Sequence, residues 1–230
     1  MRLSSSLVFP LFYIRIMLDI KTFQFNLLQE NTYIVSDETR QCVIIDCGAF
    51  FDSERKAIVT YLNDQHLQPV RLLCTHGHLD HCFGNDTIYD AFGLKPELHA
   101  EDEFLAADLT KQAADMFGMP YNRPTPPIGR FLSDGDRISF GSHELRVLHT
   151  PGHTPGGVSF YCEAEKVLFT GDTLFRMSVG RTDFERSSWQ QLLSSLRHVI
   201  SPLPDDTTVY CGHGPKTAVG DERKANPYLR

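Results

Sequence analysis

The segment 76–81 concentrates four side chains of the types that bind metal ions: His76, His78, Asp80 and His81. His76 and His78 are two positions apart, so in an extended segment both project from the same side and can chelate one ion. Asp80 and His81 follow a bend and can face a second ion. The alternative is a solvated polar loop. Such a loop would rarely place four potential ligands within six residues at the end of a strand. We therefore predict a metal site here.

The segment 76–81 follows a strand-like run and contains a glycine. Three other positions lie in a similar setting, because each follows a strand-like run and is flanked by glycine. They are His153 in Thr-Pro-Gly-His-Thr-Pro-Gly, Asp172 in Phe-Thr-Gly-Asp, and His213 in Cys-Gly-His-Gly. Each would be weak evidence alone, since a single histidine is more often a core or surface residue than a ligand. We apply that interpretation to the remaining histidines and predict no role for them: His66, His99, His143, His149 and His198.

Imidazole and carboxylate ligands indicate which ion to expect. They suit Zn(II), which we predict first, with Fe(II) or Mn(II) as alternatives. None of the seven candidate ligands is a cysteine, and the absence of a thiolate ligand argues against a soft-metal site. A catalytic zinc site keeps one coordination position for water, whose pKa falls to about 7 on the ion. The chemistry predicted is therefore attack by hydroxide at neutral pH.

The elements that must position these side chains can be predicted from hydrophobic periodicity and turn residues. Strand-like runs cover residues 19–26, 32–36, 41–46, 70–74, several stretches between 130 and 161, 166–170 and 207–211. Helical patterns cover residues 52–65, 102–117 and 187–200, the first beginning with Asp52 or Ser53 as its cap. Runs of strands separated by isolated helices favour mixed sheets covered by helices.

Composition limits the class of protein and its partners. With 230 residues, 41% hydrophobic and 22% charged, the chain can bury a sizeable core and is globular. The net charge of −7 and the lack of a Lys/Arg stripe argue against a nucleic-acid partner. No stretch is a candidate membrane span, so we expect a cytoplasmic protein without a membrane partner, and its oligomeric state stays open. We expect the six cysteines to be buried and reduced.

The N-terminal segment needs a separate prediction. Residues 1–16 carry a broken apolar stretch that is too short to span a membrane and shows no clear signal cleavage site. We predict that they form an extension, either loosely attached or preceding a natural start at Met17. Residues 17–230 are predicted to form one domain.

The run from His76 to His81 resembles the H-x-H-x-D-H signature of the metallo-β-lactamase superfamily. His153, Asp172 and His213 follow in the family's order, and the resemblance covers nearly the whole chain. It implies an α/β (α+β) fold, a four-layer αββα sandwich with two mixed β-sheets face to face and helices outside. The metals would sit at one edge of that sandwich.

The same resemblance implies how two divalent ions would be held and used. The implied assignment is His76, His78 and His153 to metal 1, Asp80, His81 and His213 to metal 2, and Asp172 to both. A bridging hydroxide would attack a carbonyl, the ions would stabilise the oxyanion, and Asp80 would also orient the hydroxide.

The branch of the family is indicated by Asp172 and its neighbours. Metallo-β-lactamases proper lack this bridging carboxylate, so we do not expect antibiotic hydrolysis. The segment Gly-Asp-Thr-Leu-Phe at 171–175 closely resembles glyoxalase II, a hydroxyacylglutathione thioester hydrolase. Arg181 follows Gly180 where that enzyme has a Gly-basic pair whose cation contacts glutathione, so Arg181 is the candidate anion-binding residue. A solvated arginine, or one paired with Asp183, is an equal alternative.

The sequence also departs from the larger glyoxalase II enzymes. Asp183 and Pro215 stand where those enzymes have tyrosines that contact glutathione, and the sequence ends at Arg230 without their C-terminal helical domain. We therefore expect a short, single-domain glyoxalase II-like hydrolase. Its expected substrate is a small anionic thioester or ester.

Three alternatives remain open. Persulfide dioxygenase, which uses one Fe(II) in the metal 1 site, resembles this chain in His76, His78, His153 and Asp172 and in Gly-Arg-Thr-Asp-Phe at 180–184. In that case Asp80, His81 and His213 would not hold a second ion. A metal-binding protein that has lost catalysis is argued against by the full ligand set. A nuclease would need a basic docking face, and the sequence shows none.

Overall fold

The structure is a computed structural model that describes residues 17–118 and 120–229. Two six-stranded mixed sheets make up its centre, together with a short hairpin. The first sheet has the order β1-β2-β3-β4-β5-β6, formed by β1 (Asp19–Phe25), β2 (Glu30–Ser36), β3 (Gln41–Ile45), β4 (Gln68–Leu73), β5 (Pro96–His99) and β6 (Arg130–Leu132). Its β1-β2-β3 part is antiparallel and its β3-β4-β5-β6 part is parallel.

The second sheet has the order β14-β13-β10-β9-β8-β7 and is antiparallel except for the β10–β13 pair. Its strands are β7 (Arg137–Phe140), β8 (His143–His149), β9 (Val158–Cys162), β10 (Val167–Gly171), β13 (Thr208–Cys211) and β14 (Thr217–Ala218). The hairpin of β11 (Leu174–Phe175) and β12 (Ser178–Val179) follows β10.

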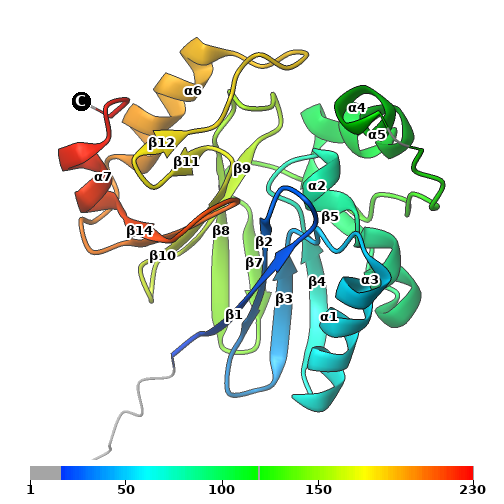
Figure 1. Cartoon of the computed structure of the whole chain (residues 1–230). Helices are drawn as coiled ribbons and strands as arrows, with labels where there is room; N and C mark the ends of the chain where they lie inside the picture. The colour runs from blue at the N-terminus through cyan, green and yellow to red at the C-terminus, as the bar shows by residue number, and fades with distance from the viewer. Residues whose placement is uncertain (1–16, 119, 230) are drawn as a thin grey trace, which may run out of the picture.

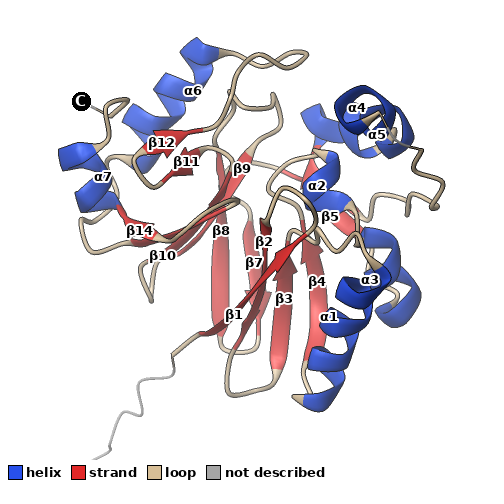
Figure 2. Cartoon of the chain, viewed as in Figure 1, coloured by secondary structure: helices blue, strands red, loops and turns tan. Residues whose placement is uncertain are grey.

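Helices cover the outer faces of both sheets (Figures 1 and 2). Over the first sheet lie α1 (Asp52–Asp64), α2 (Leu79–Cys82), α3 (Asn85–Phe92), α4 (Glu103–Ala106) and α5 (Leu109–Phe117). Over the second lie α6 (Trp189–Ser195), continued by a π-helical turn at Leu196–Ile200, and α7 (Val219–Ala225). The predicted αββα arrangement with two mixed sheets is confirmed.

Alternation along the strands explains the four layers. Tyr33 and Val35 on β2 point into the core between the sheets, whereas Ile34 between them packs toward α1 and α3. Successive side chains of a strand face opposite sides, so a strand buried on both faces is hydrophobic throughout. The core between the sheets also holds Phe160 and Phe169. A third apolar cluster, which includes Leu192 and Leu196, seals α6 against the second sheet.

Two predicted helices differ from the observed ones. The segment predicted as one helix over 102–117 is divided, because the Asp108 side chain accepts a hydrogen bond from the backbone N–H of Lys111 and so starts a new helix, α5. Helix α1 begins after Phe51 rather than at a side-chain cap. There the Glu54 carboxylate accepts the backbone N–H of Phe51 at 3.0 Å.

The structure also bears on the remaining predictions about the whole chain. All six cysteines are buried and free, as expected. None of the helices in the described part of the chain has the length and hydrophobicity needed to span a membrane. The prediction for residues 1–16 lies outside the described residues.

Candidate metal centre

All seven predicted ligands lie at one edge of the sandwich, where strands of both sheets end. The loop after β4 carries His76 and His78, α2 carries Asp80 and His81, and the ends of β8, β10 and β13 are followed by His153, Asp172 and His213. Near its end each of these strands carries a buried apolar residue, so the polar side chains that follow are held at the edge of a packed core.

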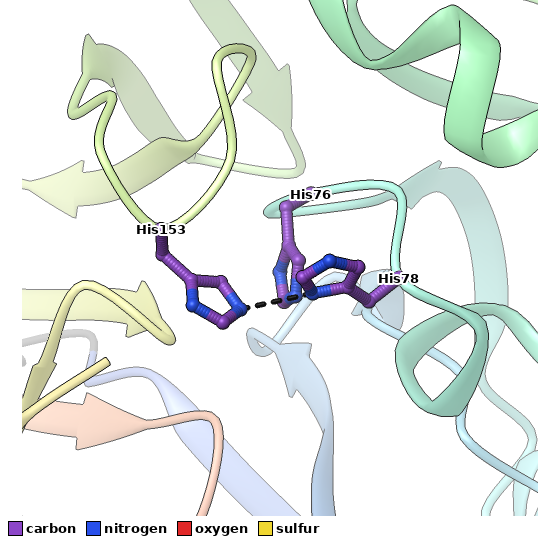
Figure 3. Close-up of side chains that lie close together, drawn as sticks. All are labelled: His76, His78 and His153. Atoms are coloured by element: carbon purple, nitrogen blue, oxygen red, sulfur yellow. Dashed lines mark hydrogen bonds between the residues drawn. The ribbon is translucent and has the colours of Figure 1, made fainter. Parts of the chain in front are cut away.

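Three imidazoles, His76, His78 and His153, form what we call the three-imidazole set. Their ring centroids lie 4.6–5.0 Å apart. The Nδ1 atom of His78 is 2.9 Å from Nε2 of His153, across the two loops that carry them (Figure 3). His76 and His78 come from the first sheet and His153 from the second, so this set joins the two halves of the molecule.

Asp80, His81 and His213 form a second group, which we call the second set. His213 Nε2 lies 3.3 Å from both Asp80 Oδ2 and His81 Nε2. Asp172 lies between the two sets, with Oδ1 3.3 Å from His81 Nε2 and Oδ2 3.5 Å from His153 Nε2. That is the position expected of a carboxylate shared by two ions.

Contacts at the ring nitrogen that points away from the metal centre fix the orientation of most of the imidazoles. In four of the five rings, Nδ1 contacts a protein oxygen at 2.8–3.0 Å, which leaves Nε2 facing the centre. The oxygen partners are Thr75 Oγ1 for His76, Asp46 Oδ2 for His81, the Arg181 carbonyl for His153 and the Leu28 carbonyl for His213. His78 differs, since its Nδ1 faces the centre.

Protonation equilibria divide the imidazoles into two kinds. Burial lowers the pKa of His78 to about 3, and burial with the neighbouring imidazoles holds the pKa of His76 well below its usual value. Both rings are therefore neutral, the form that binds metal. Burial also lowers the pKa of His81, but Asp80 and Asp172 outweigh it and raise that pKa well above its usual value. The carboxylates around His81 thus attract positive charge.

These residues fit one or two divalent ions. Nε2 of His76 is buried and has no hydrogen-bond partner, although an unpaired buried polar atom is costly. Groups with ligand atoms within 4.8 Å of one another include the three-imidazole set, the second set, and His76 with His81 and Asp172. Borderline nitrogen and carboxylate donors of this kind suit Zn(II), Fe(II) or Mn(II).

A cleft of about 320 Å³ opens in front of both sets. Its walls combine the ligand side chains with apolar residues from the β1–β2 turn, α5, the β11–β12 hairpin and the following loop: Leu28, Met116, Phe175, Val179 and Phe184. Arg181 also lines the cleft. Its guanidinium is bound to Asp183 through two contacts, Nε–Oδ1 at 2.9 Å and Nη2–Oδ2 at 2.7 Å, and it lies over the Phe184 ring. Of the two interpretations of Arg181, the structure favours the paired arginine.

Two buried carboxylates behind the ligands were not singled out from the sequence. Asp46, 1% exposed, accepts the backbone N–H of Thr75 at 2.7 Å and lies 2.9 Å from His81 Nδ1. Glu30 is fully buried, with Oε1 4.0 Å from the same nitrogen. A carboxylate at the end of the buried run 43–45, followed by Gly48, could have signalled Asp46. Glu30 carried no comparable signal, because it only becomes close through the bridge between β2 and His213.

Two of the histidines without a predicted role, at the ends of β5 and β8, lie against each other. His99 and His149 stack with ring centroids 4.2 Å apart and an angle of 14°, beside Glu101. Parallel rings direct their lone pairs in parallel planes rather than toward one point. We assign these residues no role.

Comparison with known proteins agrees with this arrangement. The chain is 36% identical over 202 residues to the hydroxyacylglutathione hydrolase GloC of Haemophilus influenzae, covering 87% of this chain and 93% of that protein. Its fold matches the crystal structure of the BLEG-1 B3 metallo-β-lactamase with a TM-score of 0.84 at 34% identity, covering 92% and 99% of the two chains. It also matches TTHA1623 in a di-iron-bound form with a TM-score of 0.80 at 37% identity, covering 91% and 100%.

A family model described as the metallo-beta-lactamase superfamily matches residues 25–213, a range that runs from the end of β1 to His213 and includes all seven predicted ligands. The chain therefore belongs to the metallo-β-lactamase superfamily.

Proposed function

We propose that this protein is a glyoxalase II-like hydrolase that cleaves a small anionic thioester or ester, using two divalent ions. The observation that carries the proposal is the position of Asp172 between the three-imidazole set and the second set. One of its carboxylate oxygens lies near His153 and the other lies near His81. A complete second set supports hydrolysis over a one-iron dioxygenase, which would leave Asp80 and His213 without a metal to bind. The relationship to GloC supports the thioester class.

The reaction joins water to the carbonyl carbon of the substrate and releases an acid and a thiol or alcohol. Divalent ions bound here would activate water and polarise the carbonyl oxygen. Asp80 faces the same space and can accept a hydrogen bond from the attacking water, which orients that water's lone pair. The apolar walls formed by Phe175 and Phe184 would hold the acyl group and limit the entry of other water.

The substrate and metal can be identified in one series of measurements. Protein purified without added metal is analysed for zinc, iron and manganese, and then assayed with S-D-lactoylglutathione, a neutral thioester, a simple ester and a lactone. We expect about two ions per chain and thioester or ester hydrolysis. Oxygen uptake with glutathione persulfide and one iron per chain would instead indicate the dioxygenase. A chromogenic β-lactam is included because BLEG-1 is described as a B3 metallo-β-lactamase, and we expect no turnover of it.

The variant that tests the site is Asp172→Ala, with Asp206→Asn as its control. Asp206 is an exposed carboxylate that pairs with Lys166 far from the ligands. We expect Asp172→Ala to lose hydrolysis while keeping the circular dichroism spectrum of the unaltered protein, and Asp206→Asn to retain hydrolysis. Hydrolysis that survives in folded Asp172→Ala protein would refute a shared-carboxylate mechanism.

A further inference from the structure

A buried carboxylate, Asp102, lies between the two loops that carry the three-imidazole set. It closes the short 3-10 helix after β5, and it is 0% exposed. It belongs to the first sheet's side of the molecule, yet its side chain reaches toward the loop that follows β8 in the second sheet. None of the predicted ligands is Asp102, so its burial needs another explanation.

Three hydrogen bonds hold the Asp102 carboxylate, and both of its oxygens accept at least one. Oδ2 accepts the backbone N–H of Gly77 at 2.9 Å and the hydroxyl of Thr154 at 2.7 Å. Oδ1 accepts the backbone N–H of Gly156 at 2.6 Å. Gly77 stands between His76 and His78, and Thr154 directly follows His153. One carboxylate therefore binds a residue directly beside each of the three imidazoles: Gly77 beside His76 and His78, and Thr154 beside His153.

The two loops also pack tightly against Asp102 itself. A Cβ atom placed on Gly77 would lie 2.9 Å from the Asp102 carbonyl oxygen, and one on Gly156 would lie 2.6 Å from the Asp102 backbone nitrogen. Such distances are too short for real side chains, so both positions require glycine for close approach to Asp102. One glycine in each of the two ligand motifs, Gly77 and Gly156, is thus explained by the same residue.

The chemistry of the contact favours a carboxylate over any neutral side chain. All three partners are donors, and an ionised carboxylate is an acceptor at both oxygens. Burial raises the pKa of Asp102, whereas the hydrogen bonds from Thr154, Gly77 and Gly156 act against that shift because each favours the charged form. An amide in its place would turn a donor toward one of the three donors.

We propose that Asp102 is a positioning residue that holds the His76–His78 loop and the His153 loop at the separation needed for three imidazoles to bind one ion. The two loops come from different sheets, so the core alone does not fix their spacing at the edge. Groups that orient metal ligands typically contribute about 10- to 100-fold to metal affinity. The inference rests on metal binding by the three-imidazole set and not on the reaction proposed above.

The test measures metal affinity without any substrate. Metal-free full-length protein is titrated with Co(II), followed by its visible absorption, and with Zn(II) in competition with a chromophoric chelator. We expect Asp102→Asn to weaken binding of the first ion by about 10-fold or more. Because binding is measured directly, the result is independent of which substrate the enzyme uses.

Asp37→Asn is the matched control. Asp37 is also buried, and it also connects the two sheets, because Oδ2 accepts the backbone N–H of Ser142 at 2.6 Å in the β7–β8 turn. It lies at the opposite end of β2 from the bridge to His213. Both variants should lose thermal stability, but only Asp102→Asn should lose metal affinity. Equal metal affinity in the two variants would show that Asp102 is merely structural.

A milder variant and a double variant complete the test. Thr154→Val removes one of the three hydrogen bonds with little change in shape, so it is useful if Asp102→Asn does not fold, and we expect it to weaken metal binding in the same direction. In a His153→Ala background, Asp102→Asn should have much less effect, because the loop it positions no longer supplies a ligand. Thr154→Val binding metal as tightly as the unaltered protein, or full additivity in the double variant, would overturn the proposal.

Discussion

At the scale of single residues, the charge available to a substrate depends on the partner of Arg181. The Arg181 side chain is 69% exposed and lines the cleft, but its guanidinium is paired with Asp183 through two contacts. Water screens an exposed pair of this kind, so Asp183 weakens the attraction of Arg181 for an anion without abolishing it. Asp183 would thus weaken the attraction of Arg181 for the anionic substrate proposed above.

Asp183→Asn should therefore improve the use of an anionic thioester. We expect KM for S-D-lactoylglutathione to fall by about two- to fivefold, because Arg181 becomes free to pair with the substrate carboxylate. The KM for a neutral ester should not change. Asp206→Asn, which frees the exposed Lys166 instead, is the control and should leave both values unchanged. A parallel change for the neutral ester would argue against a charge effect.

At the scale of elements, hydrogen bonds between turns connect the two sheets at the end opposite the metal centre. The Asp37 carboxylate after β2 accepts hydrogen bonds from Thr39 and from Ser142 in the β7–β8 turn, and it lies 3.2 Å from His143 Nδ1. Burial raises the pKa of Asp37, but these hydrogen bonds outweigh it and hold that pKa well below its usual value of about 3.9. Asp102 makes the corresponding connection at the metal end.

The depressed pKa of Asp37 predicts how stability depends on pH. The folded state favours the ionised form, so its contribution is present above the unfolded-state pKa and is lost as pH falls toward the folded-state pKa. Asp37→Asn should lower the free energy of unfolding at pH 7, and the difference from the unaltered protein should shrink below about pH 4. Urea unfolding at pH 7, 5 and 3.5 measures this.

His143→Gln serves as a companion variant, because His143 is the histidine in direct contact with the Asp37 carboxylate, with Nδ1 3.2 Å from Oδ2. The shrinking difference should persist in that background. A difference that stays constant between pH 7 and 3.5 would show that the Asp37 carboxylate is not preferentially ionised in the folded state.

At the scale of the whole molecule, the metal centre bridges the two halves of the sandwich. The three-imidazole set and the second set each combine residues of both sheets, since His153 and His213 follow strands of the second sheet. Metal ions at this centre would have affinity for the folded chain and not for the unfolded chain, in which the two halves are apart. Any such ligand stabilises the fold, by about 2.7 kcal/mol at a free concentration of 100 times its Kd.

Removing metal should therefore lower the unfolding temperature. We expect protein treated with a chelator to unfold at a lower temperature than the same protein reconstituted with Zn(II), measured by scanning calorimetry. Asp172→Ala should show a smaller difference between the two conditions, because the shared carboxylate is missing. Identical unfolding temperatures with and without metal would contradict ion binding across the two sheets.

The sequence by itself determined the seven candidate ligands and the mixed-sheet fold. Ligand types, glycine flanks and strand ends are local features, and so is the alternation that places Tyr33 and Ile34 on opposite faces. Helix ends depended on single capping side chains, which is why one helix was predicted where Asp108 starts a second.

Only the tertiary structure decided which further groups contact these ligands. Asp46, Glu30 and Asp102 become important through contacts between segments far apart in the chain, and hydrophobic patterns do not specify such contacts. The same holds for the nitrogen that each imidazole directs inward and for the pairing of Arg181 with Asp183. Local sequence fixes the period of burial, whereas the position of a polar side chain at the edge depends on how two sheets pack.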